Sequence, residues 1–509
     1  MNPQCVLGID VGSSSTKAGL FSRDGAAVDS ASRAYPTDVS RPGCAEQDAE
    51  AWWRAAVESI GELMARNPRA EVAGVGASGH ISSLTFVNVA GVPLRPALGF
   101  QDRRAIAEVD ELGRRFSRAE LAGYLGIDLP PAATWPLPRL LWFQKHEPET
   151  LDRAFRAIQA KDFVNFRLTG ELASDASSNR GMIDLANGQA PAALFARLNL
   201  PARLLPALRE PHEAIGTLRP EAARETGLTE GIPVVAGWND LNASVLGSGC
   251  AHHGDLFSIT GTSEHLGGVT DSVVERRSAA LVAAPFLPGK QLLYGVTTCG
   301  GRSLDWFLRA FGGPRDALLA RAAEVPPGSE GLFFLPYLEG ERAPIWDAAA
   351  RGAFIGIRSG HREEHFVRAI LEGVAFGLRQ ILELLPAELQ SGSGALAISG
   401  GAAQSALWNQ IRASVLGRTL TVSAHPHTGT VGAAMLAAVG CGWYPTRESA
   451  AHCMSRRARS FAPDGAEMYA ESYARFCELY PALKNWFHHG VTENTEEAQR
   501  KAHEKNSSV

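Results

Sequence analysis

Short apolar runs typical of buried strands alternate along the chain with segments of helical periodicity. Residues 71–89 read as two strands around a Gly/Ser turn, and residues 254–270 read as two more. Apolar side chains recur at helical spacing through residues 365–385, and another amphipathic helix follows Asp48. This alternation of strand and helix patterns predicts an α/β architecture.

One apolar run is interrupted in an unusual way. The stretch VLGIDVGSSSTKAGLF, from Val6, places Asp10 inside a strand pattern and then breaks into a turn of glycine, serine and threonine before the strand pattern resumes. The stretch GDLFSITGTSEHLGGVT, from Gly254, has the same layout around Gly261-Thr262-Ser263. A strand–turn–strand unit near the start of each half predicts two related domains.

The length agrees with this division, since 509 residues exceed what one ordinary core accommodates. We place the domain boundary near residue 245, giving domains at 1–245 and 246–487. Residues 488–509 are polar with no sizeable apolar face, and we expect a flexible tail there.

Composition narrows the class of protein. A net charge of -5 with 45% hydrophobic residues gives no reason to expect nucleic acid or an anionic membrane as partner. The chain has no apolar run near the roughly 20 residues of a membrane span, and no charged-then-apolar leader is evident. The seven cysteines are scattered without a CxxC pair, so we expect a cytoplasmic protein.

The first turn has the chemistry of a phosphate site. Successive backbone N–H groups of a Gly/Ser/Thr turn can surround an anion, and Lys17 adds a positive charge. A carboxylate directly before such a turn would repel phosphate unless a divalent cation lay between them, so Asp10 is interpreted as a magnesium carboxylate. The alternative is a hairpin in which Asp10 caps its own turn.

A second carboxylate ends a strand pattern in VVAGWNDLNASVLGSG, from Val234. Ligands of α/β sheets bind at the carboxyl ends of strands, where Asp240 would accept a proton from a hydroxyl nucleophile. The alternative is an N-cap of the helix that follows.

Paired glycines form a third signal. Gly400 and Gly401 lie between a strand pattern and a helix pattern in AISGGAAQSALWNQI. They let a flat ring or a phosphate approach the backbone, or they serve close strand-to-helix packing.

Taken in order, these segments resemble the FGGY family of carbohydrate kinases, within the actin/hexokinase/Hsp70 superfamily. The resemblance covers about residues 5–475, and no single motif decides it. Besides the two turns, it rests on PGCAEQDAEAWW, AIQAKDFVNFRLTGELASDASS, LPYLEGERAPIWDAAARGAFIGI, SGGAAQSALWNQI and VGAAMLAAVGCG. It implies two ribonuclease H-like domains of the actin-like ATPase type with a cleft between them.

The resemblance also implies the activity: ATP-dependent, Mg²⁺-dependent transfer of the γ-phosphoryl group to a hydroxyl of a small sugar or polyol. Asp240 matches the family's catalytic base and Asp10 its magnesium carboxylate. The nucleotide-binding residues carried over are Gly12, Ser13, Ser14, Thr16, Lys17, Gly261, Thr262, Gly300, Gly301, Asp305, Gly401 and Ala402.

On the sugar side the sequence departs from the xylulose kinase pattern SGQMHG, reading SGHISS from Ser78. Ser82 occupies the family's His position and His80 lies two residues earlier, so we expect both at the sugar site. In FQDRR, from Phe100, Asp102 and Arg104 are kept; they contact substrate or pair with each other. His427 replaces a Glu that often precedes the final helix.

A ketopentose such as xylulose or ribulose is the first expectation for the substrate, with a polyol or aldonate such as gluconate next. A non-catalytic sugar- or nucleotide-binding protein on the same scaffold is disfavoured because both carboxylates are kept. Similar kinases often form homodimers, although no segment indicates an interface. In the Trp52-Trp53 pair we expect one ring in the core and the other over the sugar cleft.

Overall fold

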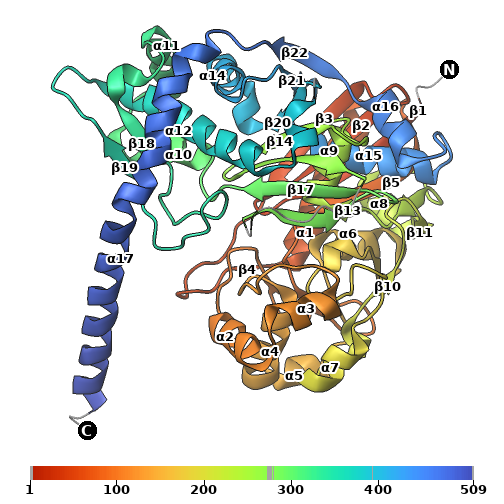
Figure 1. The fold of residues 1–509 in the computed structure, drawn as a ribbon. Helices are drawn as coiled ribbons and strands as arrows, with labels where there is room; N and C mark the ends of the chain where they lie inside the picture. Colours follow the sequence, from red (N-terminus) through yellow and green to blue (C-terminus); the bar gives the residue numbers. More distant parts are fainter. Residues whose placement is uncertain (1–3, 272–277, 279, 393, 507–509) are drawn as a thin grey trace. The chain divides into compact units, whose positions relative to one another are not determined.

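Two seven-stranded sheets organise the chain, which divides into two structural units (Figure 1). The structure is a computed structural model and describes residues 4–271, 278, 280–392 and 394–506. Unit 1 comprises Met1–His252, Ala283–Gln291 and His427–Arg456, and unit 2 comprises His253–Val282, Leu292–Pro426 and Arg457–Val509.

The sheet of unit 1 is built on an antiparallel meander that continues into parallel strands. Its order is β11-β12-β5-β1-β2-β3, and the short strand β13 also pairs with β5. Strands β1, β2 and β3 are antiparallel, whereas β5, β12 and β13 run parallel to their neighbours β1 or β5. The bounds are β1 Gln4–Val11, β2 Ser15–Ser22, β3 Ala27–Ala34, β5 Glu71–Gly79, β11 Ala214–Thr217, β12 Pro233–Val235 and β13 Trp238–Asn239.

The second sheet, whose strands other than β16 lie almost wholly in unit 2, repeats this topology, with the order β16-β17-β15-β14-β20-β21-β22. An antiparallel hairpin, β14–β15, again precedes parallel strands, β20 and β21, and an antiparallel edge strand, β22. The predicted two related α/β domains are confirmed by this repetition. The bounds are β14 Leu256–Thr260, β15 Glu264–Thr270, β16 Val282–Pro285, β17 Gln291–Val296, β20 Leu396–Gly400, β21 Leu420–Ser423 and β22 Arg457–Phe461.

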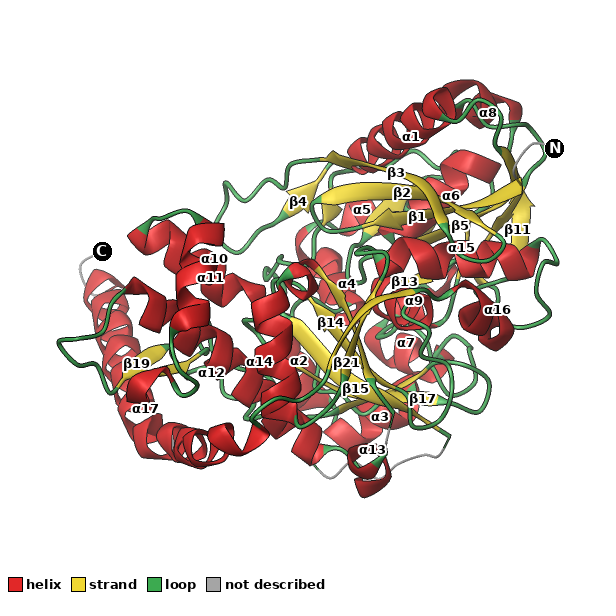
Figure 2. Ribbon diagram, turned by 90° about the horizontal axis from the view of Figure 1, so that it is seen from above, coloured by secondary structure: helices red, strands yellow, loops and turns green. Residues whose placement is uncertain are grey.

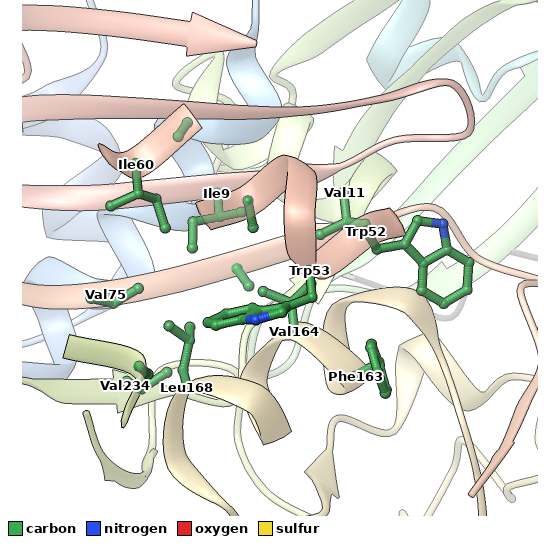
Figure 3. Packing of buried hydrophobic residues seen from close by; sticks show 14 of the residues in the cluster. Ile9, Val11, Trp52, Trp53, Ile60, Val75, Phe163, Val164, Leu168 and Val234 are labelled. Carbon is green, nitrogen blue, oxygen red and sulfur yellow. The ribbon is translucent and has the colours of Figure 1, made fainter. Parts of the chain in front are cut away.

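The two faces of β1 carry different residues because side chains alternate along a strand. Ile9 and Val11 point into a core that α1 (Ala49–Arg66) and α6 (Ala160–Thr169) cover (Figure 3). Gly8, on the opposite face, lies against the backbone of α15 (Thr428–Gly440) at Thr430. Asp10 shares that face, so it does not enter the apolar core.

The tryptophan pair differs from the sequence expectation, because both rings are buried, Trp52 at 0% and Trp53 at 2% exposure (Figure 3). Trp52 Nε1 donates to Gln47 Oε1, and Trp53 Nε1 donates to Glu225 Oε2 of α8 (Pro220–Thr226). Helix α8 closes the flank of α1 that sequence periodicity leaves open, so neither ring is available to cover a sugar.

A second apolar cluster of unit 1 lies around β6 (Thr85–Val87) and β8 (Arg156–Ile158). Four helices contribute side chains to it, α2 Ile106–Arg115, α3 Arg118–Leu125, α4 Pro136–His146 and α7 Ala192–Leu198. Strands β5 and β6 confirm the two strands predicted for residues 71–89, and α1 confirms the helix after Asp48.

In unit 2, the long predicted helix is α12 (Glu363–Leu384), which packs on α11 (Arg315–Glu324) and α14 (Ala406–Leu416) (Figure 2). Helix α17 spans Ala470–Asn506, whereas the sequence favoured a flexible tail from residue 488.

The division into compact units groups residues 427–456 with unit 1, so the structural units and the predicted boundary at residue 245 divide the chain differently. Among the described helices, none is long and apolar enough to cross a membrane.

Candidate functional site

Three neighbouring strands of unit 1 end at the same edge of the sheet. Asp10 on β1 is paired with Ser78 on β5, and Ser78 is in turn paired with Trp238 on β13. Asp240 follows β13 directly and begins α9 (Asp240–Gly247). Because paired residues of parallel strands lie side by side, both predicted carboxylates are at this edge, which we call the carboxylate edge.

Asp10 is held by contacts on both of its oxygens. Ser78 Oγ donates to Oδ1 at 2.8 Å, and Lys17 Nζ lies 3.7 Å from Oδ2. The start of α15 lies against the carboxylate so closely that a Cβ on Gly429 would be 3.1 Å from Asp10 Cγ. The positive end of this helix and Lys17 both lie beside the Asp10 carboxylate. The carboxylate therefore faces a helix terminus and does not cap its own turn.

Asp240 is positioned by the helix start but is not its N-cap. Asn239 is the N-cap, with its side chain accepting from Asn242 N, while Asp240 Oδ1 accepts from Leu241 N at 2.8 Å. Burial, with a further contribution from the negative charge of Asp10, raises the pKa of Asp240 to about 6. The structure thus excludes the N-cap alternative and gives Asp240 the proton affinity of a general base.

A buried polar network lies directly behind Asp240. Asn239 Nδ2 donates to Ser177 Oγ at 2.9 Å, and Ser177 Oγ donates to Asp175 Oδ2 at 2.6 Å. Asp175 and Asp162 lie 3.0 and 2.7 Å from Lys161 Nζ, which also donates to the carbonyl of residue 236. The chain that leads to Asp240 is therefore fixed by charged side chains, which lie in the KDF and ASDASS segments.

The first turn is accessible while part of the adjoining strand is not. Ser13 and Ser14 are exposed and Gly12 is partly exposed, whereas Thr16 on β2 is fully buried. Lys17 is opposite Asp10 in the β1–β2 register. The sequence-predicted turn thus offers backbone and serine groups, but the side chain of Thr16 has no accessible surface.

His80 follows β5 and is 5% exposed. Its backbone N–H and its Nδ1 both lie 2.9 Å from the carbonyl oxygen of Val11, and the Trp52 ring is edge-on at 5.9 Å. Since Nδ1 donates to that carbonyl, Nε2 is the acceptor of a neutral ring, and burial lowers the pKa of His80. Within the described residues, Nε2 has no hydrogen-bond partner.

Ser82 adopts a left-handed backbone conformation, φ 64°, and is buried. Its carbonyl accepts a hydrogen bond from Arg139, a fully buried arginine that also donates to the carbonyls of Gly99 and Asp102. Arg139 thus fixes the SGHISS segment through its backbone.

Asp102 and Arg104 pair with each other. Arg104 Nη2 lies 2.7 Å from Asp102 Oδ2 and also binds Glu46, while Ala45 N donates to Asp102 at 2.8 Å. Asp102 is fully buried, and the Arg104 guanidinium lies 5.0 Å from the Trp142 ring. The sequence left open whether Asp102 and Arg104 contact substrate or pair with each other, and in the structure they pair with each other.

In unit 2, three turns converge and are hydrogen-bonded to one another. Gly300 N donates to Thr262 O and Gly301 N to Gly261 O, both at 2.8 Å, and residue 403 N donates to Thr260 Oγ1 at 3.2 Å. We call residues 261–263, 300–301 and 400–403 the three-turn cluster. The predicted nucleotide residues Gly261, Thr262, Gly300, Gly301, Gly401 and Ala402 all belong to it.

The paired glycines in this cluster have separate roles. Gly400 has φ 100° and packs so closely on Thr260 that any Cβ would collide with the Thr260 carbonyl. Gly401 is exposed, with open space where a Cβ would be. Asp305 on α10 (Gly301–Phe311) is exposed and lies 3.3 Å from Arg315.

Sequence reasoning missed the groups that orient the carboxylates. Ser78, Gly429 and Ser177 make contacts between segments 62 to 351 residues apart along the chain. The one sequence feature that points to these orienting groups is the polar character of SGHISS and ASDASS at strand ends. The sequence assigns SGHISS to the sugar side, and it gives ASDASS no role of its own.

The carboxylate edge fits a hydrated Mg²⁺ ion. Among the described residues no three His, Cys, Asp or Glu side chains form a metal cluster, so a fully protein-made cage is absent there. Mg²⁺ needs only one or two carboxylates together with waters and substrate phosphates, and Asp10 supplies an oxygen donor of that kind.

Comparisons with known proteins agree along the whole chain. Residues 5–247 match the sequence model of "FGGY family of carbohydrate kinases, N-terminal domain", and residues 256–441 match that of the C-terminal domain. The chain is 30% identical over 505 residues to a xylulose kinase of Bacillus subtilis, covering 96% of this chain and 98% of the relative.

Solved structures give the same result. A gluconate kinase from Lactobacillus acidophilus superposes with a TM-score of 0.85 at 26% identity, and a ligand-bound xylulose kinase from the same organism with 0.85 at 27%. Each comparison covers 94% of this chain and 98% of the other.

Proposed function

The chain belongs to the FGGY family of carbohydrate kinases and is an ATP-dependent sugar kinase, and from this premise we propose that it phosphorylates a ketopentose such as xylulose. The observation that carries the mechanism is the pair of carboxylates at the carboxylate edge, Asp10 and Asp240, in different electrostatic environments. Lys17 and a helix start lie beside Asp10, whereas burial raises the pKa of Asp240.

In the proposed mechanism Asp240 accepts the proton of the sugar hydroxyl as that oxygen attacks the γ-phosphorus of ATP, the bond from this phosphorus to the β,γ-bridging oxygen breaks, and ADP leaves. Phosphoryl transfer depends chiefly on alignment and charge stabilisation, and a positioned base typically contributes about 10²–10⁴-fold. The network of Asn239, Ser177 and Lys161 keeps Asp240 in place. Asp10 would hold a Mg²⁺ ion, which when bound neutralises phosphate charge.

Two turns are proposed as phosphate-binding turns: residues 12–14 offer backbone N–H groups in unit 1, and residues 261–263 offer theirs in unit 2. Lys17 adds charge to the first turn. The adenosine is proposed to contact Gly300, Gly301, Gly401 and Ala402, of which Gly401 has open space beside its backbone.

We place the sugar beside His80 because its Nε2, although buried, has no hydrogen-bond partner within the described residues and is an acceptor that a sugar hydroxyl would satisfy. A neutral acceptor suits a ketose or polyol, which offers several hydroxyl donors. An aldonate is the second candidate, favoured by the structural similarity to the gluconate kinase. The pair of Asp102 and Arg104 is assigned to holding this region together.

The seven free cysteines and the family's sugar substrates favour the cytoplasm as the place of action. The test of the proposed function is ADP release from ATP with a panel of ketoses, polyols and aldonates. We expect xylulose or ribulose to give the highest kcat/KM. Equal ADP release with and without every sugar would contradict the activity, and a preference for gluconate would contradict the ketopentose assignment alone.

A further inference from the structure

A fully buried ion pair joins the strand and the helix that follow two turns of the three-turn cluster. Arg412 Nη2 on α14 donates to Glu264 Oε2 at 2.8 Å, and both residues have 0% exposure. Within the described part of the chain, Arg412 Nε and Nη1 have no hydrogen-bond partner, so Glu264 is the carboxylate that compensates this guanidinium. The pair lies entirely within unit 2.

Glu264 is attached directly to the turn at residues 261–263, since it is the first residue of β15. Its other oxygen accepts from Ser258 Oγ at 2.9 Å, on the strand that enters the turn. Its backbone N–H donates to Thr297 Oγ1 at 3.1 Å, in the segment that leads to the turn at residues 300–301. The Glu264 side chain and backbone thus contact both sides of the 261–263 turn.

Arg412 fixes the other end of the pair to the turn at residues 400–403. It lies on α14, which starts directly after that turn, and its guanidinium packs on the Trp408 ring at 4.2 Å. One turn earlier on the same helix, Asn409 Nδ2 donates to the carbonyl of residue 403 at 2.7 Å. Helix α14 therefore transmits the position of Arg412 to this turn.

We propose that Glu264 and Arg412 are positioning residues for ATP, which hold the 261–263 and 400–403 turns at the separation that the nucleotide requires. The inference rests on the proposed assignment of these turns to ATP. Burying two opposite charges costs desolvation free energy that their attraction only partly offsets, so such a pair is poor evidence for stabilisation alone. Keeping the 261–263 and 400–403 turns at a fixed separation gives the Glu264–Arg412 pair a function other than stabilisation.

The test compares Glu264→Gln with Glu372→Gln. Glu372 belongs to another buried ion pair of unit 2, with Arg368 Nε 2.7 Å away, and it binds residues 328 and 329 instead of the three-turn cluster. Both changes keep the side-chain shape and leave one buried arginine without its anion. Comparable losses of thermal stability are expected from the two variants, which makes Glu372→Gln a matched control for stability.

For Glu264→Gln we expect KM for ATP to rise about tenfold or more, because a small displacement of the turns that bind ATP weakens its binding. The KM for the sugar should stay within about twofold of the wild type. Glu372→Gln should leave both KM values near those of the wild type. Arg412→Lys, which keeps the charge, should recover part of the ATP affinity that Arg412→Met loses.

Equal KM values for ATP in wild type and Glu264→Gln, or equal increases in Glu264→Gln and Glu372→Gln, would overturn the inference. If Glu264→Gln does not fold, Ser258→Ala tests the same ion pair by removing the hydroxyl that donates to Glu264 Oε1 and orients this carboxylate toward Arg412, and an unchanged KM for ATP there overturns it. Failure of the kinase assignment would instead be seen as absence of sugar-dependent ADP release in the wild type.

Discussion

Ser78 Oγ donates a 2.8 Å hydrogen bond to Asp10 Oδ1 from the paired position on the adjacent parallel strand. This bond fixes the rotation of the carboxylate, so that its second oxygen is directed toward Lys17. The serine that begins the SGHISS segment therefore serves the proposed metal ligand as well as the sugar side.

Ser78→Ala should raise the Mg²⁺ concentration for half-maximal activity about tenfold, since groups that orient a metal ligand contribute affinity of that order. The measurement is the initial rate as a function of Mg²⁺ at saturating ATP and sugar. Ser59→Ala, a buried serine of α1, serves as the control for loss of a buried hydroxyl. An unchanged Mg²⁺ dependence would show that Ser78 does not orient Asp10 for the ion.

Asp240→Asn should lower kcat by about 10²–10⁴-fold, because the amide cannot accept the hydroxyl proton. The fold should persist, since the helix N-cap is Asn239. Single-turnover rates and circular dichroism check the two statements, with Asp110→Asn on the exposed surface of α2 as the control. Activity close to that of the wild type would remove Asp240 from the mechanism.

The pH profile of kcat/KM should rise through an apparent pKa of about 6 on its acid side, since Asp240 acts as a base only when ionised. The raised pKa means that the folded protein holds this proton more tightly than the unfolded chain. Ionisation of Asp240 therefore lowers the stability of the folded protein as the pH rises from the ordinary pKa of an aspartate to about 6. Asp240→Asn should remove this cost, so its thermal midpoint at pH 8 should equal or exceed that of the wild type.

His80→Ala should raise KM for the sugar about tenfold, since a buried acceptor that a substrate hydroxyl uses is lost, while KM for ATP changes little. Steady-state kinetics with each substrate varied in turn measures both. His80→Asn is the informative companion, because it keeps a polar side chain at the position. A larger effect on ATP than on sugar would contradict the placement of His80 at the sugar.

Arg104→Met should lower stability by about 3 kcal/mol, because it leaves the buried Asp102 without its cation, whereas Glu46 keeps Arg95 and Arg41. Chemical denaturation followed by tryptophan fluorescence reports the change. The KM for sugar of the folded variant should stay within about threefold of the wild type. A specific increase in that KM without loss of stability would instead place Arg104 in contact with the substrate.

The carboxylates and turns were predictable because each is encoded in a short contiguous stretch. Asp10 interrupts a strand pattern directly before a small-residue turn, and Asp240 follows an apolar strand. Parallel pairing then brings strand ends together by general rules of α/β sheets, so their meeting at one edge follows from order and direction.

Contacts between distant segments were not predictable in the same way. Glu264 and Arg412 are 148 residues apart, and nothing in either local sequence indicates the other. Helical periodicity assigned one of two adjacent tryptophans to the core, yet tertiary packing by α8 buried both. The prediction that the two units face a common cleft stays a prediction.

Helix α15 covers the face of the unit 1 sheet that carries Gly8, although more than 400 residues separate the two in sequence. During translation, β1, β2 and β5 leave the ribosome long before α15 exists, on the order of tens of seconds at ordinary elongation rates. Throughout that interval the nascent sheet has an uncovered face. Chaperones that bind the nascent chain thus meet an N-terminal half whose sheet is covered on this face only after α15 has been synthesised.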